Sequence, residues 1–313
     1  MVFSIHGCVM SRNPGTSIGD SLAAERSLVR ASRPRWPSWL TPPAWMRGYP
    51  PGVWLGGLLL ALVVLTTFPG AALYGVSPYT IDPINQIAPP FGHAFLGTDQ
   101  LGRDQLARVL VGGQSSLIIG FVASFVAVAL GVVYGIAAGL GPRVLDIVLM
   151  RLLDTLLAIP TIVILIFLAS IYKLDNLILI LLLGLTTWPR TARVVRNETL
   201  AARNRDFVTA SRQFGADILF IARTHVLRVI LPVLMVNFVF LVADNILALS
   251  FLSFLGLGVQ PPIPSWGNLL NDGLQNIFSN DWWLIYPPGL MIFCTVVAVN
   301  LMGEGVVATM ERS

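Results

Sequence analysis

The chain has 313 residues, of which 55% are hydrophobic and only 12% are charged. Soluble domains carry about 25% charged residues, and a globule with half that charge would aggregate in water. The mean hydropathy of +0.75 points to the same class. The composition therefore predicts an integral membrane protein, and it excludes soluble enzymes, nucleic-acid readers and disordered regulators.

The chain starts with a polar segment. Residues 1–50 are rich in Arg, Ser and Pro, and no apolar run precedes Val53, so we expect a polar tail rather than a signal peptide. The run from Val53 to about Val76 predicts the first spanning helix, which Pro69 bends or thins near its far end. Residues 77–112 are polar and interrupted by prolines, which predicts an extramembrane loop.

Four later segments are apolar and long enough to cross a hydrocarbon core of about 30 Å as helices. Helices are favoured because they satisfy their own backbone groups in lipid. Pro160 loosens the backbone bonding of the second segment and predicts a kink there. The four segments are Ser115–Leu140, Ile147–Ile171, Val233–Leu257 and Trp283–Val307.

One further apolar run, Asn176–Trp188, has only 13 residues, so by length alone it fits a buried or re-entrant piece. Arginine placement decides, because an excess of Lys and Arg marks cytoplasmic segments. Eight arginines lie in residues 190–228 and six in the tail, and counting the short run as a span puts both groups on one side. With Arg143, Arg151 and Arg312, 17 basic residues are then inside and three outside. We therefore expect an all-α polytopic membrane protein with six transmembrane helices and both termini cytoplasmic.

The residues that carry chemistry argue against an enzyme. A Walker A loop needs a lysine before Ser or Thr, and the single lysine, Lys173, is followed by Leu174. The three histidines, His6, His93 and His225, are scattered, so neither a metal cluster nor a Ser/His/Asp triad is expected in the membrane. We predict no catalytic residue, no metal site and no cofactor bound by this chain.

Ionisable groups inside predicted spans are costly, and each one raises a functional hypothesis. Asp244 and Glu304 either line a polar pathway, bind a coupling ion, or are polar groups packed between helices or reaching toward the interface. Asp154 follows Arg151 by three residues on the same helix face, and we expect these two side chains to form an ion pair near the interface.

The predicted span Ser115–Leu140 carries glycine at every fourth position of its second half, at Gly131, Gly135 and Gly139. Positions four apart lie on one helix face, and the lack of a side chain lets another backbone approach closely. The pattern predicts helix packing at this face, and contact with a transported solute is the alternative.

The arginine-rich segment 190–231 is compatible with helix along most of its length. Gly215 supplies a break that tolerates unusual dihedral angles, Asp217 is placed to cap a second helix, and Pro232 is placed to open the fifth span. We expect a helix–turn–helix on the cytoplasmic face whose small, partly apolar face inserts into a groove of another protein. A solvated basic loop is the alternative.

This segment resembles the cytoplasmic coupling loop of the permease subunits of ABC importers. Their Glu-Ala-Ala element, following glycine and Ile-x-Leu-Pro are matched by Thr209-Ala210-Ser211, Gly215 and Ile230-Leu231-Pro232. Thr in place of Glu and Ser in place of the last Ala are departures. The resemblance implies contact with an ATPase subunit through Asp206, Thr209, Ala210, Ser211, Gly215, Ala216, Leu231 and Pro232.

Further motifs resemble the C permease subunits of dipeptide, oligopeptide and nickel importers. They are HAFLGTDQLGRD at 93–104, Arg151–Asp154 through Pro160, LSFLGLGVQPP at 252–262 with PSWG at 264–267, and Asn300–Gly305. The resemblance covers about residues 90–305. It implies that the segments 90–112 and 258–282 face an external solute-binding protein, through Gly97, Thr98, Asp99, Gly102, Arg103, Asp104 and Trp266.

The resemblance implies a type I ABC importer permease fold, with a cytoplasmic tail at 1–50, a first helix and external loop at 51–112 and a five-helix core at 113–308. It implies a bacterial inner-membrane subunit that works with a homologous second permease, two ATPase subunits that bind ATP and Mg, and a solute-binding protein. The expected solute is a di- or oligopeptide, or a related small solute such as a nickel chelate. The alternatives are an ion-coupled secondary transporter that uses Asp244 or Glu304, and an intramembrane hydrolase.

Overall fold

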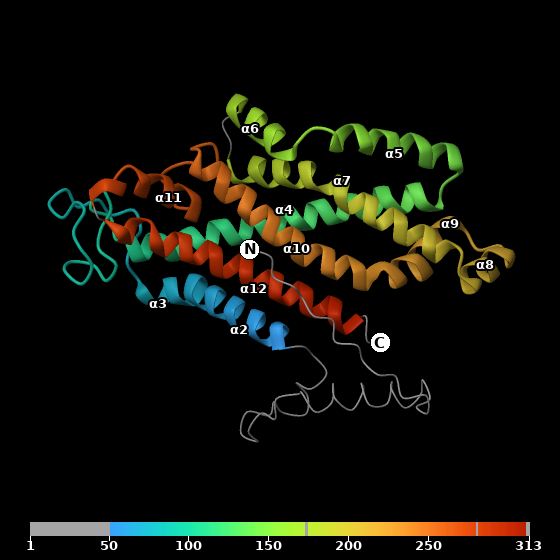
Figure 1. Cartoon of the computed structure of the whole chain (residues 1–313), viewed down its shortest axis with the longest axis horizontal. Helices are drawn as coiled ribbons and strands as arrows, with labels where there is room; N and C mark the ends of the chain where they lie inside the picture. Colours follow the sequence, from blue (N-terminus) through green and yellow to red (C-terminus); the bar gives the residue numbers. More distant parts are fainter. Residues whose placement is uncertain (1–50, 173–174, 280, 311–313) are drawn as a thin grey trace, which may run out of the picture. The chain divides into compact units, whose positions relative to one another are not determined.

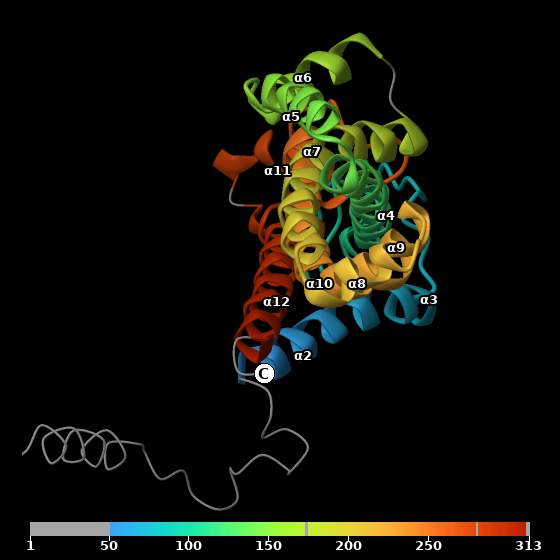
Figure 2. The same ribbon diagram turned by 90° about the vertical axis from the view of Figure 1, so that its right-hand side faces the viewer.

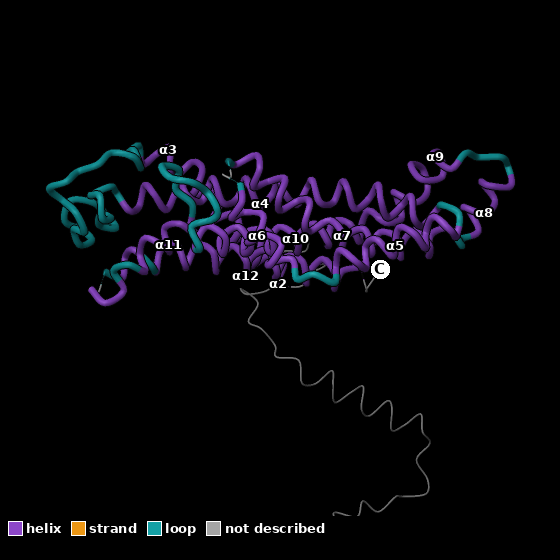
Figure 3. Tube along the Cα trace, turned by 90° about the horizontal axis from the view of Figure 1, so that it is seen from above, coloured by secondary structure: helices purple, strands orange, loops and turns teal. Residues whose placement is uncertain are grey.

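The computed structural model describes residues 51–172, 175–279 and 281–310, which belong to the larger of two compact units, Tyr49–Ser313. The predicted tail, residues 1–50, lies outside the described residues. Within the described residues the chain is built of helices and loops, and the only β-type pairing there is a single bridge between Thr98 and Asp104 (Figure 3).

Five helical segments of the described chain are long and apolar enough to cross a membrane, and a bent helix pair makes a sixth if it counts as one span. They are α2–η3–α3 (Pro51–Leu65, Thr66–Gly70, Ala71–Tyr74), α4 (Gln105–Leu140), α7 (Asn176–Arg203), α9–η4–α10 (Ile218–Ile221, Ala222–Val226, Leu227–Phe254) and η6–α12 (Trp282–Leu284, Tyr286–Met310). The bent pair is α5 (Arg143–Leu157) with α6 (Thr161–Ile171), and the shorter elements are α8 (Asp206–Gln213), α11 (Trp266–Leu274) and η5 (Ile277–Ser279). The predicted all-helical membrane architecture is confirmed.

The helices α4, α7 and α10 form the centre of this unit, since α4 packs along both α7 and α10. α12 packs against α10 on one side and against α2 on the other. α5 and α6 lie on the opposite side of the central helices from α2 (Figures 1 and 2). α8 and α9 lie at one end of the bundle, and α11 lies at the other with the loop before α4 (Figure 1). We call these the α8 end and the α11 end.

The third predicted span is broken rather than continuous. α5 and α6 are separated by three residues and bent by 73° relative to each other. The break falls at Pro160, which has no backbone N–H to donate and which disfavours helical geometry in the residue before it. The expected single helix Ile147–Ile171 is therefore wrong, and the predicted kink is a full interruption.

The second predicted span starts earlier than expected, because α4 begins at Gln105 and not at Ser115. The carboxylate of Asp104 accepts a 2.8 Å hydrogen bond from the backbone N–H of Ala107 and caps the helix. The last part of the predicted loop 77–112 is consequently helical.

The short predicted span Asn176–Trp188 is the first part of α7, which has 28 residues. Pro189 lies inside this helix, where it removes one backbone hydrogen bond without ending the helix. Residues 190–203, the first part of the predicted cytoplasmic segment 190–231, are therefore helical and continuous with this span.

The glycines of α4 lie against α7 in a parallel register. A Cβ atom added at Gly131 would lie 2.7 Å from Cβ of Thr191, and one added at Gly135 would lie 2.6 Å from Cβ of Val195. The third glycine, Gly139, meets Thr199 in the same way at 2.7 Å. Since any side chain would overlap α7, the close packing of these two helices depends on glycine here.

Polar side chains also join the central helices. Thr191 Oγ1 on α7 donates a 2.9 Å hydrogen bond to Asn237 Oδ1 on α10. Asn245 Nδ2 on α10 donates a 2.8 Å hydrogen bond to Ser124 Oγ on α4, and that hydroxyl donates to the Gly120 carbonyl at 2.7 Å. Such bonds hold the register between helices, because an unpaired polar group between them would be costly.

We expect Gly135→Leu to destabilise the chain by about 1–3 kcal/mol, because the new side chain must force α4 away from α7. The free energy of unfolding in detergent micelles, followed by circular dichroism during SDS titration, measures this loss. Gly57→Ala on α2 is the matched control, since nothing lies within 4 Å of a Cβ atom added there. It should leave stability unchanged or raise it slightly, and equal losses in the two variants would contradict the packing argument.

Candidate functional site

The α8 end carries a hairpin, residues 204–221, formed by α8, a turn and α9, which we call the α8–α9 hairpin (Figure 1). Val208 and Ile221 are completely buried and anchor it to a cluster at this end of the bundle. Ala202 from α7 and Ile230 from α10 belong to the same cluster. The hairpin is therefore fixed to two spanning helices through apolar contacts.

The turn of the hairpin depends on Gly215, whose φ of +82° falls in the left-handed region that favours glycine. Its N–H donates to the Arg212 carbonyl, and the N–H of Ala216 donates to the Ser211 carbonyl, both at 3.1 Å. This is the Schellman pattern that ends a helix. Nothing in the described chain lies within 4 Å of a Cβ atom added at Gly215, so the turn stands open.

Apolar side chains are exposed on the hairpin around this turn. Phe214, directly before the glycine, is 92% exposed. Phe207, Ile218, Leu219 and Phe220 are also exposed. An apolar cluster on an otherwise polar protrusion is typical of a surface that contacts another protein. Phe214 is not among the predicted coupling residues, although a large aromatic residue just before a helix-ending glycine is a recognisable signal in the sequence.

Five of the predicted coupling residues, Asp206, Thr209, Ala210, Ser211 and Gly215, are on α8 or its turn, and Ala216 follows them. Among them only Ser211 and Ala216 are partly buried.

The helix that follows the turn differs from the prediction. Pro232 lies inside α10 rather than opening the fifth span, because helix is continuous from Ile218 to Phe254. Leu231 and Pro232 are consequently on the spanning helix and not on the hairpin. Asp217 occupies the cap position of α9, but its side chain makes no capping hydrogen bond, so the predicted cap is wrong.

Asp99 organises the α11 end of the bundle. Its Oδ1 atom accepts the backbone N–H groups of Leu101 and Arg103 at 2.9 and 2.8 Å. Its Oδ2 atom accepts a hydrogen bond from Arg103 Nε at 2.7 Å and also forms an ion pair with Arg108 Nη1. Arg108 lies on α4 and reaches Asp272 on α11 at 3.3 Å, so one buried arginine joins the loop, α4 and α11.

Asp82 also stabilises the loop before α4. The backbone N–H of Asp82 donates to the Leu101 carbonyl at 3.1 Å, and its carboxylate accepts Asn85 Nδ2 at 2.7 Å. The hydrogen bond from Asn85, followed by the one from the Ile84 N–H, lowers the pKa of the Asp82 carboxyl below its ordinary value.

Asp104 and Trp266 connect this loop to the helices. Besides capping α4, Asp104 accepts a 2.8 Å hydrogen bond from the Tyr74 hydroxyl on α3. Trp266 is completely buried, and its Nε1 donates to the Val109 carbonyl at 3.0 Å. The expectation that Trp266 faces outward is therefore corrected: the indole packs against Gly113 of α4, where there is no side chain to exclude it.

Most of the residues predicted to face a solute-binding protein are likewise interior. Gly97, Thr98, Asp99 and Gly102 are buried, and Arg103 and Asp104 are partly buried. Gly97 and Gly102 have φ values of +72° and +75°, which glycine adopts readily. These residues shape the loop, and the buried ones do not face outward as predicted.

A pocket of ≈ 260 Å³ opens beside this cluster, between the loop before α4 and the segment 261–272. Its lining includes both arginines of the cluster, Arg103 and Arg108, together with Asn268 and Asp272.

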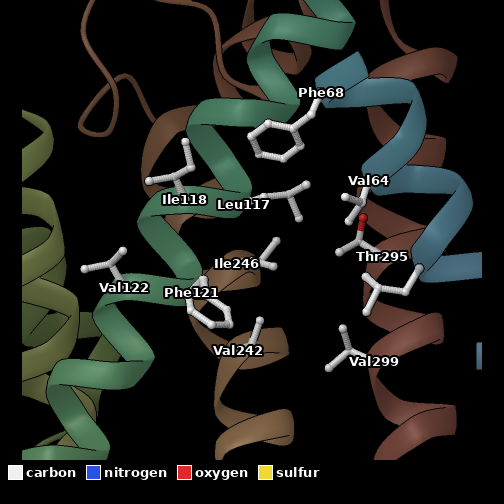
Figure 4. A pocket seen from close by; sticks show the side chains of 11 residues that line it. Val64, Phe68, Leu117, Ile118, Phe121, Val122, Val242, Ile246, Thr295 and Val299 are labelled. Carbon is white, nitrogen blue, oxygen red and sulfur yellow. The ribbon is translucent and has the colours of Figure 1, made fainter. Parts of the chain in front are cut away.

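A second pocket, of ≈ 390 Å³, lies between α2, η3, α4, α10 and α12 (Figure 4). The one polar side chain in its lining, Thr295, donates its hydroxyl to the Met291 carbonyl at 2.6 Å, so this pocket offers nothing to hold a charged solute.

Two ion pairs join α5 to α7. Asp146 pairs with Arg196 at 2.5 Å, and Asp154 pairs with Arg193. The prediction that Asp154 pairs with Arg151 is wrong, because α7 passes α5 and Arg193 of α7 pairs with the carboxylate.

Glu304 is exposed near the end of α12 and makes no hydrogen bond or ion pair with the described residues.

We expect Asp99→Ala to destabilise the chain by about 3–5 kcal/mol, because it leaves Arg108 buried without its main partner. Thermal unfolding of the purified subunit in detergent measures the loss. The double variant Asp99→Ala with Arg108→Leu should recover part of the stability, since it removes the unpaired charge. A single variant that unfolds at the wild-type temperature would contradict the anchoring role of Asp99.

The family described as binding-protein-dependent transport system inner membrane component matches residues 131–313. The chain is 34% identical to the dipeptide transport system permease protein DppC of Bacillus subtilis (strain 168), over 85% of this chain and 83% of that protein. It is 35% identical to the di/tripeptide transport system permease protein DppC of Pseudomonas aeruginosa (strain UCBPP-PA14), over 80% of this chain and 85% of that protein.

The similarity extends to oligopeptide systems. The chain is 35% identical to the oligopeptide transport system permease protein OppC of Haemophilus influenzae, over 68% of each protein. The family match covers more than half of the chain, and the relatives align over most of it. The chain therefore belongs to the family of binding-protein-dependent transport system inner membrane components, as a membrane-embedded permease subunit similar to those of peptide transport systems.

Proposed function

We propose that this chain is the membrane-spanning permease subunit of an ATP-driven ABC importer for di- and oligopeptides. The observation that carries the proposal is the α8–α9 hairpin. Buried Val208 and Ile221 hold it to the spanning helices, while Phe214 stands exposed beside an open turn. A protrusion with this combination suits a partner that must move the membrane helices by moving the hairpin.

The peptide substrate is supported by the relatives, whose names refer to dipeptide, di/tripeptide and oligopeptide transport. A nickel chelate is the second candidate solute. The polar pocket beside Arg103 and Arg108 lies at the α11 end, which we assign to the external side, where a solute-binding protein delivers its solute.

The energy for transport comes from partners in this proposal. The single lysine of the chain, Lys173, is not followed by Ser or Thr, so the chain has no Walker A loop. Two ATPase subunits therefore bind ATP and Mg, and a homologous second permease completes the membrane part. The arginine-rich α8 end and both termini face the cytoplasm of a bacterial inner membrane.

Closure of the ATPase pair around ATP would displace the α8–α9 hairpin as a rigid body. Because α7 leads into the hairpin and α10 leads out of it, the displacement reaches both helices at once. The helices then repack between two arrangements that open opposite faces of the membrane. Such a cycle needs a partner whose contacts differ between the two states, and ATP binding and hydrolysis supply that difference.

We expect Gly215→Trp to release the ATPase subunits from the complex. The indole has room in the subunit alone, but it projects from the turn into the space that the ATPase fills. A loss of about 2 kcal/mol of docking energy weakens binding roughly thirtyfold. Copurification of the ATPase subunits and ATP-driven uptake should both fall, while the second permease stays bound.

Gly215→Asn is the control for the backbone, because asparagine tolerates a positive φ. It should keep both ATPase binding and uptake. Wild-type copurification and uptake in Gly215→Trp would overturn the docking role of the hairpin. Uptake by the purified chain alone, driven by an ion gradient, would replace the importer with the secondary transporter.

The solute is tested by competition in cells that carry the whole transporter. We expect an excess of unlabelled di- and tripeptides to block uptake of labelled dialanine, because they occupy the same delivery route. Ni²⁺ should leave this uptake unchanged. Competition by Ni²⁺ and none by peptides would reverse the assignment of the solute.

A further inference from the structure

Asp244 is an acidic side chain on the surface of α10, inside a helical segment long and apolar enough to cross a membrane. Asp244 precedes the end of α10 at Phe254 by ten residues, which is about 15 Å along a helix. This depth is half of a hydrocarbon core of about 30 Å. Asp244 is exposed, so in lipid its carboxylate would have to lose its hydration without a full set of partners.

Asp244 points away from the apolar side of α10. Val242 and Ile246 line the apolar pocket of Figure 4, and each is two residues from Asp244. Two residues correspond to a rotation of about 200° around a helix. The carboxylate therefore projects from the side of α10 opposite the pocket.

On the neighbouring helix α7, the exposed side chains change from apolar to charged along the helix. Its exposed residues Leu181 and Leu185 are apolar, whereas Arg190 and Arg193, further along, are exposed and charged. Arg190 and Arg193 are three residues apart, so they share one face. Arg190 follows Asn176 by fourteen residues, about 21 Å along the helix, which is still within the thickness of the hydrocarbon core.

Acidic groups lie near these arginines on two of the helices that pack against α7. Arg190 precedes Thr191, whose hydroxyl bonds Asn237 of α10, and Asp244 follows Asn237 by seven residues, about two turns along the same face of α10. Arg193 forms an ion pair with Asp154 on α5, and both side chains of that pair are about half exposed. α7 packs against both α5 and α10. We call Asp154, Arg190, Arg193 and Asp244 the charged band: it crosses three helices and carries two positive and two negative charges.

Exposed charges at the depths of Asp244 and Arg190 are incompatible with a lipid-facing surface, because ionisable groups in spanning segments face water or protein. Arg193 follows Asn176 by seventeen residues, about 25 Å along α7, so its pair with Asp154 lies nearer the α8 end. We propose that the charged band borders a hydrated passage and binds the two charged ends of a peptide in transit. Arg190 and Arg193 receive the carboxylate, and Asp154 and Asp244 receive the ammonium group. The peptide as ligand rests on the proposed function, whereas the hydration of the band does not.

The charges of the band suit a zwitterion. The band is neutral as a whole, and a peptide adds one positive and one negative charge. The ammonium group of the peptide can therefore take the place of an arginine beside Asp154 or Asp244, and the carboxylate can take the place of an aspartate beside Arg190 or Arg193. Every charge then keeps a partner of opposite sign. The ends of the peptide lose water during passage, and the band offsets that loss with charge-assisted hydrogen bonds.

Labelling of introduced cysteines tests the hydration. The complex is prepared with Cys8→Ser and Cys294→Ser and then with Asp244→Cys, and it reacts with a charged methanethiosulfonate reagent. Asp244→Cys should react at least about tenfold faster than Phe125→Cys, because only a hydrated thiol ionises and meets the reagent. Phe125 on α4 is 64% exposed, and Phe121 and Val122 on the same helix side are also exposed and apolar. Equally slow labelling of both positions would overturn the hydrated passage.

Uptake of dialanine by the whole complex tests the ligand. Asp244→Asn should lower kcat/KM by about tenfold or more, the size expected for one lost charge-assisted contact. Asp244→Glu, which keeps the charge, should restore most of it. Glu304→Gln on α12, a carboxylate outside the band, should change kcat/KM less than about twofold. An excess of dialanine should also slow the labelling of Asp244→Cys, because Arg190, Arg193 and Asp154 still hold the peptide beside the introduced thiol.

The two proposals fail separately. Wild-type uptake in Asp244→Asn, or labelling that dialanine does not slow, would overturn the peptide-binding role of the band. A wild-type complex that takes up no peptide would overturn the proposed function and this ligand with it. The labelling rates of Asp244→Cys and Phe125→Cys alone still decide whether the band is hydrated, whatever the solute is.

Discussion

The close contact of α4 with α7 is the constraint on which the rest of the structure depends. Gly131, Gly135 and Gly139 remove side chains from one face of α4 over two helical turns, and α7 occupies the space. Two further helices are positioned directly against this pair: α10 packs against both helices, and α5 is bound to α7 by ion pairs. A single larger residue in the glycine series would therefore shift several helices together.

The same pair connects the two ends of the molecule. At the α11 end, α4 carries Arg108, which holds the loop and α11 together through Asp99 and Asp272. At the α8 end, Arg203 of α7 donates hydrogen bonds to the carbonyls of Gly139 and Gly141 at 3.3 and 3.4 Å. The last carbonyls of a helix have no partner within it, and this arginine supplies one at the end of α4. The α8–α9 hairpin is therefore connected through α7 to a packed element that extends to the α11 end.

Local patterns made part of this structure predictable. Composition is enough for the membrane class, the spacing of four shared by Gly131, Gly135 and Gly139 marks one helix face, and Gly215 marks a turn. The length of α7 was not predictable, because the apolar run ends at Trp188 and the helix continues through Pro189, where local rules favour a break. The partner of Asp154 and the burial of Trp266 depend on residues 39 or more positions away, and no spacing rule reaches that far.

The register of the glycine contact also settles how many times the described chain crosses the bundle. Residues 131, 135 and 139 of α4 meet 191, 195 and 199 of α7, so the two helices point the same way. The chain must return between them, and the bent pair of α5 and α6 is the only segment that can bring it back. That pair therefore counts as a crossing in spite of its 73° bend, which makes the number of crossings even. The start of α2 lies beside the end of α12 accordingly, with Val53 against Gly305.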